Sequence, residues 1–121
     1  MGSLISLGHN VLVSMARVLT VGLVASVSAP VAAATPVIEI EIRDHLFSPA
    51  EVTIPAKTKV KLMVINQDAT PEEFESYELN REKVIAGDSR AVIFIGPLPV
   101  GRYPFFGEFY PKTAQGVVIV E

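Results

Sequence analysis

Val37-Ile38-Glu39-Ile40-Glu41-Ile42-Arg43 is the stretch of this sequence that decides the fold class. Isoleucine occupies every second position, and charged residues fill the positions between. Because successive side chains of a strand point to opposite faces, this alternation predicts a strand with one buried and one solvated face. The stretch therefore predicts a sheet that covers a hydrophobic core.

Short runs of the same character follow along the chain, separated by turn residues. Pro49 precedes the first of them and stops the ladder of backbone hydrogen bonds, and Pro55 begins the turn that follows it. The runs are residues 51–54, 59–65, 84–85, 90–95, 102–106 and 117–120. About seven short strands with regularly spaced turns are typical of an all-β sandwich.

The segment between residues 66 and 83 is different, because it is rich in glutamate. Thr70-Pro71-Glu72-Glu73 has the spacing of a capping box, with proline at the first helical position. Acidic residues in a first turn also suit the helix dipole. We therefore expect a short helical insertion in the sandwich, beginning near Thr70.

Composition excludes several classes of function. The 121 residues carry a formal net charge of -3, so the basic surface that nucleic acid requires is absent. The chain has no cysteine, which excludes disulfides, thiolate catalysis, iron–sulfur clusters, cysteine-bound zinc and a normal blue-copper centre. With two histidines and no glycine-rich phosphate loop, a hydrolase or transferase site is not expected.

The N-terminal residues have the order of a secretory signal peptide. A segment with the single basic residue Arg17 runs into an apolar stretch and then into small residues that end at Ala34. The apolar stretch is shorter than the roughly 20 residues of a membrane span, which argues against the alternative of a retained anchor. We expect residues 1–34 to be cleaved after about Ala34, and residues 35–121 to form the exported domain.

Three blocks of the exported part resemble the cupredoxin fold. They are residues 47–57 (FSPAEVTIPAK), the strand that ends in Asn66, and residues 98–105 (LPVGRYPF). The resemblance covers nearly all of residues 37–121. It implies an all-β Greek-key cupredoxin-like sandwich, here with about seven strands and the short helical insertion.

Three shorter blocks resemble a narrower subfamily. They are residues 71–76 (PEEFES), 79–83 (LNREK) and 105–109 (FFGEF). The subfamily consists of small exported cupredoxin-like proteins associated with bacterial iron uptake. This resemblance implies a periplasmic location, a role in iron(II) uptake, and an inner-membrane iron permease and a periplasmic metal-binding protein as partners.

The copper ligands of blue-copper members have no counterpart in this sequence. By the resemblance, the first histidine position falls within residues 72–74 and the cysteine position near Phe106. The second histidine falls at Phe109 or Tyr110, and the methionine at Ala114. None of these residues is an imidazole or a sulfur ligand, so type 1 copper is excluded.

The remaining ligands are carboxylates, one imidazole and one phenol. We predict an oxygen-rich metal site from Glu73, Glu75 and Glu108, with His45 and Tyr110 as further candidates. Such ligands suit iron or copper(II) better than copper(I). The site would collect iron(II), or assist its oxidation, and no catalytic residue is assigned.

Each of these residues also has a structural interpretation. His45 could cap a bulge through a hydrogen bond to Asp44, and Glu72 could cap the expected helix. Arg81 could grip Glu75 in an ion-pair network whose other members are Glu78, Glu82 and Lys83. Two alternative functions stay open: a metal-free domain that docks a transporter or its binding protein, and a copper(II) carrier.

Overall fold

The structure is a computed structural model that describes residue 2, residue 8 and residues 16–30 and 34–121. The chain divides into two units with the boundary between Val31 and Ala32. Residues 16–30 contain neither helix nor strand, and their side chains are exposed. Part of the expected signal peptide, including Ala32 and Ala33 before the expected cleavage site, lies outside the described residues. In the described part, no helix is long and apolar enough to cross a membrane.

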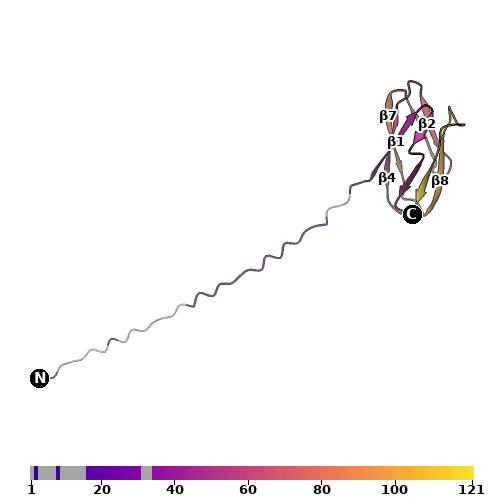
Figure 1. Ribbon diagram of the computed structural model, residues 1–121. Coiled ribbons are helices and arrows are strands. Elements are labelled where there is room, and N and C mark those ends of the chain that lie inside the picture. The colour runs from indigo at the N-terminus through magenta and orange to yellow at the C-terminus, as the bar shows by residue number, and fades with distance from the viewer. Residues whose placement is uncertain (1, 3–7, 9–15, 31–33) are drawn as a thin grey trace. The chain divides into compact units, whose positions relative to one another are not determined.

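Residues 34–121 form a sandwich of two sheets (Figure 1). One sheet has four strands in the order β2-β1-β4-β7, and the other has five in the order β3-β9-β8-β5-β6. The strand bounds are β1 Val37–Arg43, β2 Leu46–Ser48, β3 Glu51–Ile54, β4 Val60–Asn66, β5 Glu72–Ser76, β6 Arg81–Ile85, β7 Ser89–Ile95, β8 Gly101–Gly107 and β9 Gln115–Val120.

Two of the strand pairs are parallel, and the others are antiparallel. β1 pairs with β4, and β3 pairs with β9, in parallel. Because parallel neighbours need long connections, the chain crosses between the sheets rather than running as a simple meander. These crossings bring the β8–β9 loop beside the start of β5, and the candidate site lies there.

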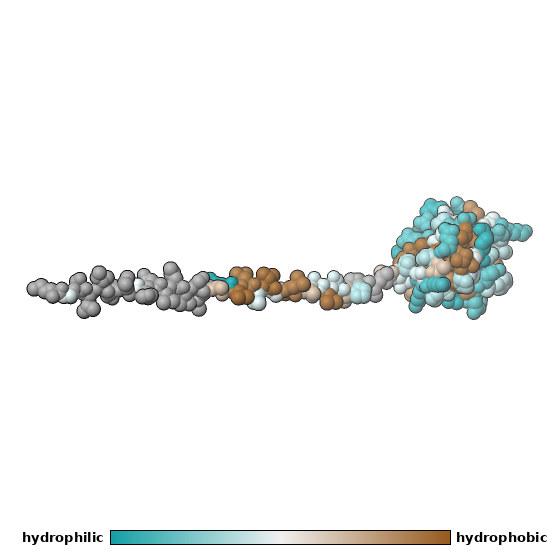
Figure 2. All heavy atoms as spheres, turned by 90° about the horizontal axis from the view of Figure 1, so that it is seen from below, coloured by the Kyte–Doolittle hydropathy of each residue, from teal (hydrophilic) through white to brown (hydrophobic). Residues whose placement is uncertain are grey.

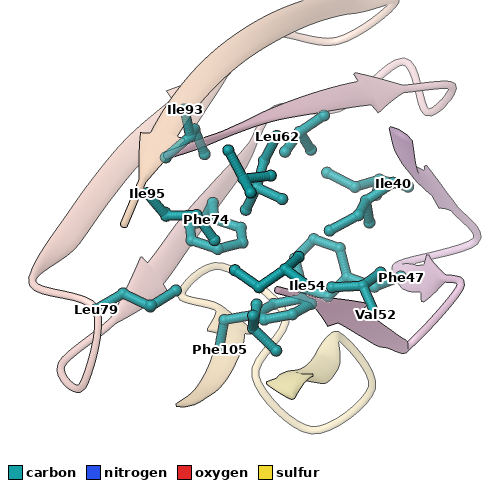
Figure 3. Packing of buried hydrophobic residues seen from close by; sticks show 14 of the residues in the cluster. Ile40, Phe47, Val52, Ile54, Leu62, Phe74, Leu79, Ile93, Ile95 and Phe105 are labelled. Carbon is teal, nitrogen blue, oxygen red and sulfur yellow. The ribbon is translucent and has the colours of Figure 1, made fainter. Parts of the chain in front are cut away.

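The core lies between the inner faces of the sheets (Figure 3). Ile40, Ile42 and Leu62 are fully buried, as the alternation in β1 and β4 predicts. Three phenylalanines fill the centre. The ring centroid of Phe105 lies 5.0 Å from that of Phe47 and 4.9 Å from that of Phe74. Burial of each such side chain stabilises the fold by roughly 1.5–3 kcal/mol. The face of the domain seen in Figure 2 is largely hydrophilic, which agrees with one central core.

Two details of the predicted architecture are wrong. The sandwich has nine strands rather than about seven, and residues 34–121 contain no helix, so no helical insertion is present. The sequence around Glu72 forms strand β5, with Glu72, Phe74 and Ser76 buried on one face. A short helix could bury only part of this face, whereas a strand buries Phe74 in the core and pairs with both β6 and β8. Glu72 is therefore not a helix cap.

Candidate functional site

Three carboxylates converge on the outer face of the five-stranded sheet. Glu73 and Glu75 alternate with the buried Phe74 on β5, so their side chains point away from the core. Glu82 on β6 lies directly opposite Glu75 in the antiparallel pairing. Each of the three offers a ligand atom, and these atoms lie within 4.8 Å of one another. We call these three residues the acidic triad. In residues 16–30 and 34–121, no other group of three or more His, Asp or Glu side chains meets this criterion.

Glu108 is the fourth carboxylate of this region. It follows β8 directly, and its backbone N–H donates to the Glu73 carbonyl at 2.9 Å. Its side chain is close enough for its charge to raise the pKa of both Glu73 and Glu75. The structure therefore brings together Glu73, Glu75 and Glu108, as well as Glu82, which the sequence patterns assign to a different role.

Two members of the acidic triad, Glu73 and Glu75, have a raised pKa. A hydrogen bond shared with Glu82 raises the pKa of Glu73 to about 7, with loss of hydration and the charges of Glu82, Glu75 and Glu108 acting in the same direction. Loss of hydration, followed by the charges of Glu82 and Glu108, raises the pKa of Glu75. The surroundings of Glu73 and Glu75 thus disfavour the ionised form of both carboxyl groups.

The predicted ion-pair network is wrong. Arg81 donates from Nε to the Phe94 carbonyl at 2.8 Å, and from an Nη to the carbonyls of Leu79 and Asn80. In the described ranges, the one ion pair within 4.0 Å joins His45 to Asp68, so neither Arg81 nor Lys83 pairs with a triad carboxylate. The guanidinium serves to fasten the β5–β6 hairpin to the edge of β7.

His45 and Tyr110 lie together at a separate corner. Their rings stack with centroids 3.5 Å apart, and His45 Nδ1 lies 3.5 Å from Asp68 Oδ2. Asp68 also accepts the backbone N–H groups of Asp44 and His45 at 2.8 and 3.0 Å. Both of these residues have positive φ, so the Asp68 carboxylate holds a tight turn between β1 and β2. His45 is not a member of the convergent carboxylate group.

The positions that correspond to copper ligands carry a different chemistry. Glu72 is 1% exposed and lies against Gly107, at the base of the loop that carries Phe109. The side chains at the positions that the resemblance assigns to copper ligands offer the carboxylates of Glu72 and Glu73 and the phenol of Tyr110, and neither an imidazole nor a sulfur. These residues do not fit a type 1 copper ion, which takes two imidazoles and a thiolate.

The triad suits a hard cation chemically. Carboxylate oxygens are the ligands that divalent cations such as magnesium, manganese and iron(II) accept in proteins. The sequence patterns do not identify Glu82 as a ligand, because they place residues 70–73 in a helix and so do not predict that strand β5 pairs with β6. A signal was present, since a four-residue turn over residues 77–80 places Glu75 opposite Glu82.

Comparison with known proteins places this architecture in a family. The model of the cupredoxin-like domain matches residues 15–120. An uncharacterized protein of Rickettsia prowazekii (strain Madrid E) is 45% identical over 83 residues, which cover 69% of this chain and 66% of that protein. The chain thus spans just under two thirds of the length of this relative.

Solved structures share the fold at low sequence identity. The metal-binding domain of the Cu(I)-exporting P-type ATPase CopA of Streptococcus pneumoniae D39, determined with Cu(I), aligns with a TM-score of 0.60 at 20% identity over 70% of this chain and 84% of that one. A purple cupredoxin from Nitrosopumilus maritimus aligns with a TM-score of 0.54 at 21% identity, over 69% and 98%. Amicyanin from Paracoccus versutus gives 0.56 at 22% identity, over 75% and 85%.

These likenesses concern the fold, and the family model covers most of the sequence. Together with the two-sheet arrangement of β1 to β9, they lead to one conclusion. The chain belongs to the cupredoxin-like domain family.

Proposed function

We propose that this chain is a periplasmic cupredoxin-like protein that binds iron(II) at the acidic triad, with Glu108 as an additional ligand, and assists iron uptake. Glu73, Glu75 and Glu82 are the primary ligands. The signal-like N-terminus supports export, and the resemblance of residues 71–76 and 105–109 to the iron-uptake subfamily supports the pathway.

One observation carries the proposal: the three carboxylates converge, and no cationic side chain of residues 16–30 or 34–121 forms an ion pair with them. Their ligand atoms lie within 4.8 Å of one another, and Arg81 is bound to backbone carbonyls instead. Like charges at such distances destabilise the folded protein unless a proton or a cation neutralises them. The hydrogen bond with Glu82 is the main cause of the raised pKa of Glu73, and repulsion from the neighbouring carboxylates adds to it. A bound divalent cation would replace the shared proton and remove this repulsion.

The ligand chemistry favours iron over copper(I). The related structures include a domain determined with Cu(I) and a protein named as copper-binding, but this chain has no cysteine. All-oxygen ligands suit iron(II), and they stabilise iron(III) more strongly because its charge is greater. The same site would therefore favour transfer of one electron from the bound iron(II) to an external acceptor such as dioxygen. An inner-membrane iron permease and a periplasmic metal-binding protein are the partners that such a role requires.

The proposal is tested by calorimetric titration of residues 35–121 with iron(II) under anaerobic conditions, with copper(II) and zinc in parallel. We expect binding of one iron(II) with micromolar affinity, lost when Glu73 or Glu75 is replaced by alanine. Lys83→Ala is a matched control on the same hairpin, because it removes an exposed charged side chain without removing a carboxylate. Absence of heat with every metal would contradict the proposal.

A specific observation favours a second candidate, a metal-free docking domain. His45, Phe109, Tyr110 and Pro111 line a mainly apolar hollow at the end of the sandwich, and Phe109 is 47% exposed. An exposed aromatic beside such a hollow is suited to contact another protein, such as a transporter or its binding protein. If no metal binds and Phe109→Ala abolishes association with a partner, this second function replaces the first.

A further inference from the structure

Glu72 is a buried charged residue whose role the proposed function does not explain. It is 1% exposed, at the start of β5 and on the opposite face from Glu73. Its Oε2 atom is buried and has no hydrogen-bond partner among the described residues. Because a buried and unsatisfied carboxylate oxygen costs stability, this position needs an explanation beyond packing.

The other carboxylate oxygen joins two segments. Oε1 accepts the backbone N–H of Glu73 and the backbone N–H of Phe109, each at 2.9 Å. These N–H groups belong to β5 and to the loop that follows β8. Glu108 precedes Phe109 directly and donates its own N–H to the Glu73 carbonyl at 2.9 Å. The backbone at Glu108 is therefore held at two successive N–H groups. The N–H of Glu108 donates to the Glu73 carbonyl, and the N–H of Phe109 donates to Oε1 of Glu72.

Gly107 shows how closely the loop is drawn onto Glu72. A Cβ at Gly107 would lie 2.5 Å from the Glu72 carboxyl carbon and 2.7 Å from the Ala114 Cβ. Only glycine leaves room for the carboxylate between the loop and the strand at this distance. The carboxylate of Glu72 thus occupies the base of the loop from residue 107 to residue 114.

We propose that Glu72 is a positioning residue, which holds the Glu108 side chain beside the acidic triad by fastening the β8–β9 loop from inside the sandwich. This inference rests on the proposed function for its consequence in metal binding. Its structural part, the fixing of Glu108 relative to Glu73, is independent of any metal.

The test compares three variants of the purified protein expressed from the full chain. Glu72→Ala removes both hydrogen bonds to Oε1, whereas Glu72→Gln keeps an oxygen that can accept them. Ser76→Ala is the matched control: Ser76 is also buried on the inner face of β5 and also joins it to β8, through its hydroxyl and the Pro104 carbonyl at 2.7 Å. It lies at the other end of the strand from Glu108.

The first measurement is amide hydrogen exchange at Phe109 and Glu108. Relative to the change in global stability, we expect exchange at Phe109 to accelerate at least about tenfold in Glu72→Ala and to stay near the wild-type rate in Ser76→Ala and Glu72→Gln. Equal acceleration in Glu72→Ala and Ser76→Ala would overturn the inference, because Glu72 would then act on stability alone. This measurement needs no metal, so it decides the inference even if the wild-type protein binds no iron(II) and the proposed function fails.

The second measurement is a double-mutant cycle on iron(II) affinity. We expect Glu72→Ala and Glu108→Gln each to weaken binding about tenfold, and the double variant to bind within about twofold of Glu108→Gln alone. Glu72→Gln should retain affinity within about threefold. Independent, additive losses would overturn the inference, since Glu72 would then not act through Glu108. Should Glu72→Ala fail to fold, Gly107→Ala displaces the same carboxylate and takes its place in both measurements.

Discussion

Asp68, in the loop after β4, and Glu73, on the outer face of β5, are both half-buried carboxylates, but their surroundings act on them in opposite ways. Asp68 accepts two backbone N–H groups and lies beside His45, and the hydrogen bond from His45 N–H is the main cause of its lowered pKa. Glu73 shares a hydrogen bond with Glu82 and lies near two further carboxylates, so its pKa rises to about 7.

The difference separates a structural carboxylate from a candidate ligand. The Asp68 carboxylate is satisfied within the protein by the backbone N–H groups of Asp44 and His45. It therefore does not need a ligand to stabilise its charge. The charge of Glu73 is opposed within the protein, and only a proton or an added cation relieves it. The acidic triad is therefore the better candidate for metal binding, and the Asp68 turn serves the fold.

The largest expected effect is on metal binding by the acidic triad. Replacing Glu73, Glu75 and Glu82 together by glutamine keeps their size and removes the charge. We expect iron(II) affinity to fall by at least about 100-fold, while the folded protein without metal becomes more stable because the repulsion is gone. Calorimetry and urea unfolding measure the two effects. If both affinity and stability fell, the carboxylates would be part of the architecture, and the contrast with Asp68 would be lost.

The second expected effect is the change of the free energy of unfolding with pH, which has opposite signs for Glu73 and for Asp68. The pKa of Glu73 is raised on folding, so its contribution is fully present below its ordinary pKa near 4.5 and is lost as pH rises through about 7. Without metal, the wild-type protein should become less stable between about pH 5 and pH 8. In Glu73→Gln this slope should be shallower. Urea unfolding across that range measures it, and an unchanged slope would show that Glu73 does not carry the shared proton.

The strand framework could be predicted from the sequence, but the pairing of the acidic residues could not. Alternation in β1 and β4 identifies the buried face correctly because apolar and charged side chains have different hydration free energies. In β5 the inward positions are Glu72, Phe74 and Ser76, so two of the three buried residues are polar and the alternation is masked. The capping-box pattern at residues 70–73 then favours a helix, although tertiary pairing with β6 and β8 determines a strand.

The composition of the candidate site depends on that one local assignment. Glu73 and Glu75 are candidates from residue type alone, whereas Glu82 joins them only through the β5–β6 register. Sequence patterns also leave Arg81 free to pair with Glu75, because nothing in them shows that the edge of β7 offers the Phe94 carbonyl to the guanidinium. The periodicity of apolar residues along the sequence does not predict long-range backbone contacts of this kind.

The third prediction addresses the structural carboxylate. Asp68→Asn leaves one amide oxygen for the two N–H groups of Asp44 and His45, so one hydrogen bond is lost in a turn with positive φ at both residues. We expect a loss of about 1 kcal/mol in unfolding free energy at neutral pH and no change in iron(II) affinity. The wild-type contribution should disappear as pH falls through the lowered pKa of Asp68, the reverse of Glu73. A loss of affinity would mean that this turn also shapes the metal site.

The smallest expected effect is at His45, and it sharpens the boundary between the two regions. The ring centroids of His45 and Tyr110 lie 3.5 Å apart. His45→Phe keeps a flat ring that can stack on Tyr110 and removes the only imidazole of residues 34–121. Because His45 lies outside the convergent carboxylate group, iron(II) affinity should stay within about twofold. A tenfold loss of iron(II) affinity would show that His45 is a ligand. The β1–β2 turn and the acidic triad would then have to contact the same metal ion. An unchanged affinity, measured beside the loss in the triad variant, would instead assign metal binding to the outer face of the sheet alone.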